Sequence, residues 1–116
     1  MIKRGEIYFA ALDKGVGSEQ RGYRPIIVLQ NNVGNEYSPT IIIAPLTSKP
    51  KRHYPTHVKI KKYESGMIED SMVLLEQIHT IDKIRLGPFI GCATDEVMKK
   101  IESAILLSLG IINKGV

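Results

Sequence analysis

Two uninterrupted apolar runs restrict the folds available to this chain of 116 residues. Residues 25 to 29 read Pro-Ile-Ile-Val-Leu, and residues 40 to 46 read Thr-Ile-Ile-Ile-Ala-Pro-Leu. Short β-branched runs of this kind are typical of strands whose two faces are both buried. Apolar residues make up 43% of the chain, which is enough for one core at this length. We therefore expect a single domain over residues 1 to 116.

Four further segments have the pattern of strands. They are residues 6 to 12, 56 to 61, 71 to 81 and 87 to 92. In the first, Ile7, Phe9 and Ala11 share one face when the chain is extended. In the second, Val58 and Ile60 alternate with polar side chains, which predicts a half-exposed strand.

Polar loops separate these strands. Residues 13 to 23 are about twice as long as an ordinary hairpin loop, and such lengths are more common in binding loops than in simple connectors. Residues 31 to 39 contain the Asn, Gly, Ser and Pro of a turn region. Residues 49 to 55 hold two prolines and several cations, which predicts a second exposed loop.

The C-terminal segment is the one convincing long helix. Thr94 is a suitable N-cap, Asp95 and Glu96 complement the positive end of the helix dipole, and Gly110 is a suitable end. Its apolar stripe is wide, so it covers the core and leaves contact with a partner subunit as an alternative. Many short strands, long loops and one terminal helix predict an α+β fold that is mainly β, a small partly open barrel with the helix packed on it.

Positive charge is concentrated in one part of the chain, whose formal net charge is +4. Residues 49 to 62 contain six cations and no carboxylate; the cations are Lys49, Lys51, Arg52, Lys59, Lys61 and Lys62. One interpretation is a lysine-rich strand that protects a sheet edge from pairing. The other is a patch that faces phosphates.

The compartment is predicted from the cysteine content and the N-terminus. Cys92 is the only cysteine, which excludes an internal disulfide framework and a cysteine-based metal cluster. Glu6 interrupts the basic start, and the apolar run from Ile7 to Leu12 is too short for an export or membrane segment. We expect a cytoplasmic protein with no membrane partner.

Standard catalytic motifs do not occur in the sequence, which has no Walker loop, no GxSxG, no HExxH and no Rossmann glycine pattern. We therefore expect no cofactor and no metal. Among the histidines, His53 and His79 read as surface residues. His57 is the least ordinary, since it follows a proline-bounded loop and is expected on the exposed face of the basic strand, where it can contact a nucleic acid.

Arg24 and Thr47 occupy matching places beside the two buried runs. Arg24 lies where the polar loop enters the first run, and Pro25 restricts the backbone there. A guanidinium held in this way presents its planar N–H donors in a fixed direction, where they can bind a phosphate. Thr47 ends the second run, so the two side chains meet if the strands are neighbours. The alternative is an ordinary arginine and threonine at strand ends.

Five segments together resemble one known family. In order from Arg4 toward the terminal helix, they read RGEIYFAAL, GSEQRGYRPIIVLQN, IIIAPLTS, PTHVKI and VLLEQIHTIDKIRL. Their order and spacing are similar to those of the MazF and PemK toxin endoribonucleases. The GSEQ and LLEQIHTIDK segments are the most specific part of the resemblance.

The resemblance implies a CcdB/MazF-like, SH3-like barrel that forms a homodimer and cuts single-stranded mRNA at a short sequence without a metal. It also implies a cognate antitoxin whose disordered C-terminal segment occupies the RNA groove. The family's catalytic arginine falls on Arg24, and its catalytic serine or threonine falls on Thr47. Positions that line the RNA path fall on Ser18, Glu19, Gln20 and Gln77. Arg21 stands where relatives often carry a small residue, which affects the expected cleavage sequence.

Metal-free RNA cleavage uses the 2'-hydroxyl as nucleophile and leaves a 2',3'-cyclic phosphate and a 5'-hydroxyl. It needs in-line geometry, charge stabilisation and proton transfer at two oxygens. A guanidinium is a poor base, so Glu19, His57 or positioning alone are the alternatives for the proton. Two other classes compete with the nuclease: a non-catalytic inhibitor related to CcdB, and an SH3-like nucleic-acid binding module.

Overall fold

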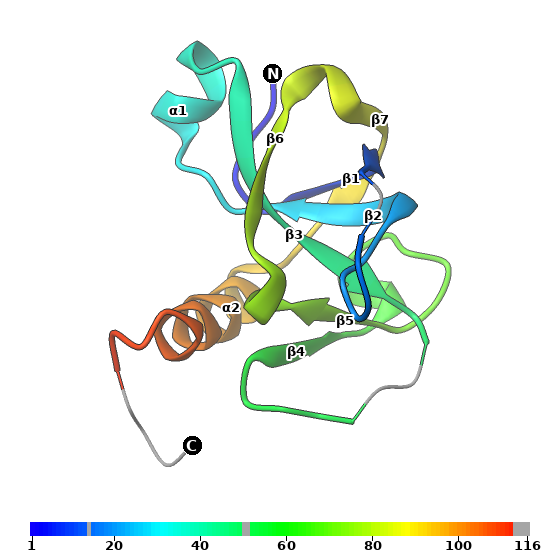
Figure 1. The fold of residues 1–116 in the computed structure, drawn as a ribbon, viewed down its shortest axis with the longest axis vertical. Helices are drawn as coiled ribbons and strands as arrows, with labels where there is room; N and C mark the ends of the chain where they lie inside the picture. The colour runs from blue at the N-terminus through cyan, green and yellow to red at the C-terminus, as the bar shows by residue number, and fades with distance from the viewer. Residues whose placement is uncertain (14, 50–51, 113–116) are drawn as a thin grey trace.

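The computed structural model describes residues 1 to 13, 15 to 49 and 52 to 112 (Figure 1). Its strands are β1 (Glu6–Leu12), β2 (Gly22–Val28), β3 (Thr40–Thr47), β4 (His57–Ile60), β5 (Ser71–Leu74), β6 (His79–Asp82) and β7 (Leu86–Cys92). Its helices are α1 (Asn32–Tyr37) and α2 (Asp95–Ser108), and three short 3-10 turns are η1 (Lys62–Glu64), η2 (Leu75–Gln77) and η3 (Lys83–Arg85).

All seven strands belong to one antiparallel sheet with the order β4-β5-β3-β2-β1-β7. The long strand β3 has different partners along its length: β6 pairs with residues 40 to 43, and β5 pairs with residues 46 and 47. The sheet therefore divides around β3 and bends, and α2 lies beside β4 (Figure 1). This is the predicted fold, a mainly β, partly open SH3-like barrel with a C-terminal helix.

The two apolar runs separate two hydrophobic clusters, as expected for strands with two buried faces. That expectation is wrong at Ile42, which is 41% exposed near the start of β3. Ile27 and Leu46 pack into one cluster, which α2 covers with Val97 and Ile101. Ile26 packs into the other cluster, on the opposite face, with the remaining members Ala10, Leu12, Val28, Ile41, Ile43 and Ile81. Because neighbouring residues of β2 point to opposite clusters, the strand has no exposed face over Ile26 to Val28.

The predicted face of β1 is partly wrong. Ile7 is buried, but Ala11 is exposed, while Ala10 and Leu12 are buried. β1 pairs with β2 without interruption from Ile7 to Leu12, so its alternation is regular. Ile7 packs into the first cluster, whereas Ala10 and Leu12 lie on the opposite face and pack into the second. The core therefore covers the face of Ile7 only at the start of the strand, which leaves Ala11 exposed.

The single strand predicted over residues 71 to 81 is interrupted. It forms β5, then η2, then β6. The break lies opposite Pro45, which cannot donate a ladder hydrogen bond from its backbone nitrogen. The hydroxyl of Ser108 in α2 donates to the carbonyl of Leu75 at 2.8 Å, which ties the interruption to the helix.

Both helices begin at side-chain caps. The predicted cap of α2 is confirmed, since the Thr94 hydroxyl accepts the Val97 N–H at 3.2 Å. The region predicted as a turn at residues 31 to 39 instead contains α1, which begins where Asn31 accepts the Gly34 N–H. None of the helices within the described ranges has the length and apolar character that a membrane crossing requires.

Candidate active site

The register of the two buried strands brings Arg24 and Thr47 together. β2 and β3 are antiparallel neighbours in which Ile26 pairs with Pro45, and two further steps along this register set Arg24 opposite Thr47. Both residues line one hollow of about 280 Å³, called here the Arg24–Thr47 hollow. The structure therefore places the two residues at the same hollow, at the ends of neighbouring strands.

Hydrogen bonds to the backbone fix both side chains. The Arg24 Nε donates to the carbonyl of Arg21 at 2.7 Å. Within the described ranges its two terminal nitrogens make no further hydrogen bond, so their donors remain for a ligand. Thr47 is only 3% exposed, and its Oγ1 accepts the Lys49 N–H at 3.2 Å. Because that bond uses a lone pair, the Thr47 hydroxyl proton is still available for donation.

One wall of this hollow is apolar and comes from distant parts of the chain. Its members are Phe9, Pro25, Leu46, Met67, Ile68 and Ile90. The segment after η1 approaches β7 closely there. A Cβ on Gly66 would lie only 2.8 Å from the Ile90 carbonyl oxygen, and the φ of Gly66 is +80°, a backbone conformation that favours glycine. A side chain at Gly66 would therefore displace the wall. Glu69 follows it and is the one carboxylate among the residues that line this hollow within the described chain.

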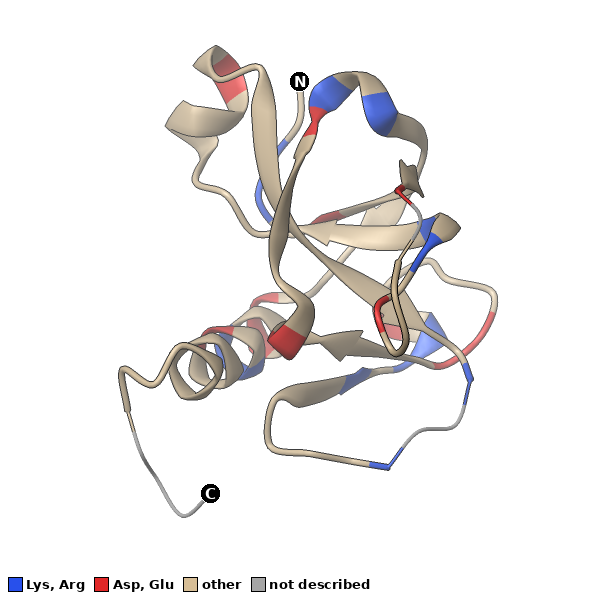
Figure 2. Cartoon of the chain, viewed as in Figure 1, with Lys and Arg blue, Asp and Glu red and all other residues tan. Residues whose placement is uncertain are grey.

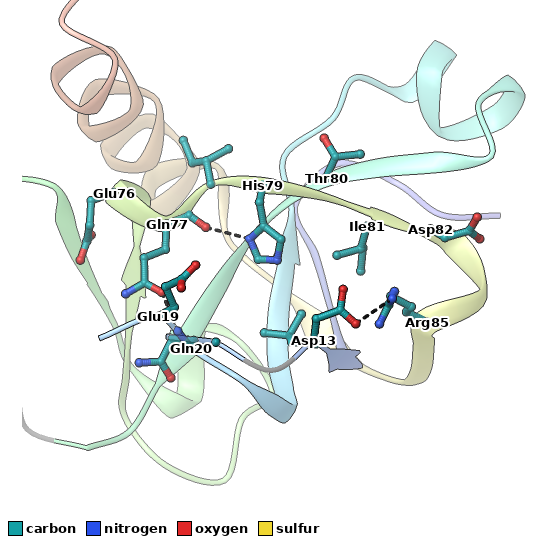
Figure 3. A pocket seen from close by; sticks show the side chains of 13 residues that line it. Asp13, Glu19, Gln20, Glu76, Gln77, His79, Thr80, Ile81, Asp82 and Arg85 are labelled. Atoms are coloured by element: carbon teal, nitrogen blue, oxygen red, sulfur yellow. Dashed lines mark hydrogen bonds and ion pairs between the residues drawn. The ribbon is translucent and has the colours of Figure 1, made fainter. Parts of the chain in front are cut away.

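A second, larger hollow of about 550 Å³ lies along β6 (Figure 3). It is called here the loop hollow, because the loop between β1 and β2 forms one side through Glu19 and Gln20. Gln77 and His79 belong to the opposite side. No residue lines both the loop hollow and the Arg24–Thr47 hollow, as far as the described chain goes.

Gln77 anchors the loop with both ends of its side-chain amide. Its Oε1 accepts the Gln20 N–H at 2.8 Å, and its Nε2 donates to the Ser18 carbonyl at 3.1 Å. Ser18 therefore takes part in this contact through its backbone carbonyl, and the residue is exposed. Glu19 stabilises the loop from within, since its Oε1 accepts the Val16 N–H at 2.8 Å.

Arg85 holds the start of the same loop. Its Nη2 forms an ion pair with Asp13 at 2.9 Å, drawn in Figure 3, and its Nη1 donates to the Ala11 carbonyl at 3.2 Å.

The side-chain Oε1 of Gln20 is buried without a hydrogen-bond partner in the described part of the chain. A buried acceptor in that state is available to a ligand that brings a donor.

Comparison with known proteins decides the family. A family model described as "PemK-like, MazF-like toxin of type II toxin-antitoxin system" matches residues 3 to 109. The chain belongs to this family. It is 48% identical to Endoribonuclease EndoA of Bacillus subtilis, over 97% of this chain and 98% of that protein. The sequence resemblance to MazF and PemK toxins is thereby confirmed.

Solved structures of the toxin family have the same fold. An endoribonuclease in complex with its cognate antitoxin, from Mycobacterial species, is 26% identical with a TM-score of 0.79, over 97% of this chain and 99% of that one. MazF from Deinococcus radiodurans is 23% identical with a TM-score of 0.79, over 94% and 96% of the two chains, and supports the fold alone.

The predicted position of His57 is wrong. Its ring was expected on the exposed face of β4, but its side chain is only 2% exposed. Its Nδ1 accepts the Tyr54 N–H at 3.4 Å, so its Nε2 donates to Glu76 at 2.8 Å. His57 is the first residue of β4, where the turn from Tyr54 and the Glu76 side chain cover it, so strand alternation did not apply. His53 also lies nearby, with its ring centre 6.3 Å from that of His57.

Sequence reasoning missed three residues that support the site. Glu76 stands beside Gln77 in η2, so one short turn binds both the loop between β1 and β2 and the loop before β4. Arg85 was missed because its partners, Asp13 and Ala11, are remote in sequence. Glu69 was missed because only the folded chain brings it to the hollow of Arg24 and Thr47. The LLEQ segment was a usable signal for Glu76. Among the residues the structure describes, no three His, Cys, Asp or Glu side chains gather as metal ligands do.

Proposed function

We propose that this chain, an endoribonuclease of the PemK and MazF toxin family, cuts single-stranded mRNA at a short sequence without a metal ion. The observation that carries the proposal is the shared hollow of Arg24 and the buried hydroxyl of Thr47. A fixed guanidinium and a fixed hydroxyl donor at one point are suited to a phosphate, whose oxygens accept from both.

The proposed reaction is an internal transesterification. The ribose 2'-oxygen loses its proton to a base and attacks phosphorus, and the bond from phosphorus to the 5'-oxygen breaks. The leaving 5'-oxygen takes a proton from solvent, so the products are a 2',3'-cyclic phosphate and a 5'-hydroxyl. Arg24 places its terminal N–H groups on the non-bridging oxygens, where negative charge develops. The Thr47 hydroxyl donates a hydrogen bond to one of these oxygens. Because both groups are held before the substrate arrives, little reorganisation is needed in the transition state.

Glu69 is the proposed general base. The two bases considered from sequence lie elsewhere: Glu19 lines the loop hollow, and both ring nitrogens of His57 are engaged. Glu69 lines the Arg24–Thr47 hollow itself. An ionised carboxylate there can take the proton of the 2'-hydroxyl, which removes the need for a guanidinium to act as a base.

RNA recognition is assigned to the loop hollow. Splayed bases of a single strand expose their hydrogen-bonding edges, and Gln20 offers an unused buried acceptor there. Glu19 presents a second acceptor, whereas Ser18 and Gln77 set the loop's shape. His57 positions the loop before β4 and does not contact RNA in this proposal.

The proposed partners follow the family. A homodimer is the expected state, and a cognate antitoxin is expected to place its disordered C-terminal segment in the RNA groove. One relative was solved in complex with its cognate antitoxin, which supports this expectation. The place of action is proposed to be the cytoplasm, where mRNA is found.

The decisive experiment incubates the purified protein with a long single-stranded RNA in EDTA. Discrete cuts with cyclic-phosphate and 5'-hydroxyl ends are expected. Binding without cuts would instead indicate a nucleic-acid binding module, and neither binding nor cuts would indicate an inhibitor of a protein target. Cuts that appear only after a divalent metal is added would overturn the metal-free mechanism.

A further inference from the structure

Lysines from separate segments gather on one small hollow next to the proposed active site. Lys59 lies in β4, Lys61 follows β4, and Lys49 follows β3. All three line a hollow of about 160 Å³, called here the lysine hollow. Figure 2 shows the blue segments of β4 and of the chain before and after it at the same corner of the molecule.

The lysine hollow continues the Arg24–Thr47 hollow. Thr47, Ser48 and Ser71 line both of them. A polymer whose phosphate sits at Arg24 and Thr47 therefore has a polar path, bordered by the two serines, toward the lysines. The loop hollow shares no lining residue with this path within the described ranges.

The charges in the lysine hollow leave it positive. Within the described chain, Lys49 and Lys59 form no ion pair, and Lys61 lies 3.6 Å from Asp70 in a pair whose side chains are both more than half exposed. A hydrogen bond from the Lys62 backbone N–H, with help from the Lys61 charge, keeps the pKa of Asp70 below its ordinary value. Asp70 therefore stays ionised and offsets one of the three lysines.

Protection of a sheet edge does not account for this arrangement. β4 is an edge strand, and that role explains an outward lysine within it, which is Lys59. Lys49 and Lys61 lie outside the strand, yet they face the same hollow. The exposed Ser48 also lines it, and hydroxyls are common donors to phosphate oxygens.

We propose that the lysine hollow binds a phosphate of the RNA backbone one or a few nucleotides away from the bond that is cut. This inference rests on the proposed function, because it extends the substrate path of the same site. The hollow adds affinity through phosphate charge and reads no base, so it acts on any RNA long enough to reach it.

The test compares two double variants that lose the same charge. Lys49→Gln with Lys59→Gln removes the two unpaired lysines, and Lys99→Gln with Lys100→Gln removes two exposed lysines of α2. The probe is a cleavable-site RNA of about 20 nucleotides, blocked by a 2'-deoxy nucleotide at the cut, with versions shortened on the 5' or the 3' side. Binding is measured between 50 and 200 mM salt, and thermal melting checks that both variants fold.

The hollow variant is expected to bind the long RNA about tenfold more weakly than the wild type. The slope of log affinity against log salt is expected to fall by about 1 to 1.5, as for two lost contacts to a single strand. One of the shortened RNAs should bind the wild type and the hollow variant equally. The α2 variant should match the wild type with every RNA.

The proposal is wrong if the two double variants have equal effects on RNA binding. It is also wrong if the hollow variant keeps its affinity for RNA but loses affinity for a polyglutamate peptide, tested as a second probe. Neither result contradicts the proposed function, which is wrong only if the wild type does not cut unblocked RNA.

Discussion

The Arg24–Thr47 hollow and the loop hollow are fixed by different interactions. Arg24 and Thr47 emerge from two neighbouring buried strands, so the sheet register determines their separation. The loop hollow depends on hydrogen bonds and an ion pair from Gln77 and Arg85. Each such bond contributes only about 1 kcal/mol, whereas the register is maintained by the whole sheet. The proposed chemistry thus sits on the rigid part, and recognition sits on a part that can vary without disturbing it.

The largest effect is expected from Arg24→Ala. The substitution removes the charge that faces the phosphate, and cleavage of the mapped RNA site should become undetectable. The side chain is partly exposed and bonds only to a loop carbonyl, so the melting temperature should stay near that of the wild type. Lys99→Ala is the control for the lost charge, because it removes an exposed cation of α2 that lines none of the hollows. Full activity of Arg24→Ala would remove this hollow from the chemistry.

Thr47→Ala should lower kcat by roughly two to three orders of magnitude, the range for loss of one oxyanion donor. Thr47→Ser keeps the hydroxyl and the bond from the Lys49 N–H, so it should retain most of the activity. Single-turnover cleavage separates the two variants. A loss below tenfold in Thr47→Ala would make Thr47 a structural residue of the strand end.

Glu69→Gln should lower kcat by about 10²-fold, the lower range for removal of a general base. Single-turnover cleavage of the mapped site measures the loss. Glu36→Gln changes an exposed carboxylate of α1 and serves as the control. A kcat of Glu69→Gln close to that of the wild type would leave positioning and charge as the whole mechanism.

The smallest effect is expected in the loop hollow. Gln77→Ala removes both bonds to the loop and should raise KM about tenfold with little change in kcat. Gln77→Glu keeps the acceptor for the Gln20 N–H but loses the donor to the Ser18 carbonyl, so its KM should be intermediate. Hydrogen exchange at the Gln20 amide should quicken in the alanine variant. A fall in kcat as large as that of Thr47→Ala would show that the two hollows are coupled.

Local pattern predicted the parts of the fold where neighbours in sequence set the environment. The strand predicted over residues 25 to 29 is confirmed up to Val28, and the strand over residues 40 to 46 and the cap at Thr94 are also confirmed. Errors arose where a remote contact intervened. Strand alternation placed His57 outside, but Glu76, from another strand connection, covers it. The predicted strand over residues 71 to 81 was broken opposite Pro45, a residue of β3.

The amino-acid sequence alone determined the family, the two strands that carry Arg24 and Thr47, and the cap of the terminal helix, because each depends on residue types and spacing along the chain. Only the tertiary structure decided that Glu69 joins Arg24 and Thr47, that Gln77 holds the loop, and that lysines from separate segments share one hollow. These contacts depend on the register and bend of the sheet, and that geometry arises only when distant strands pair.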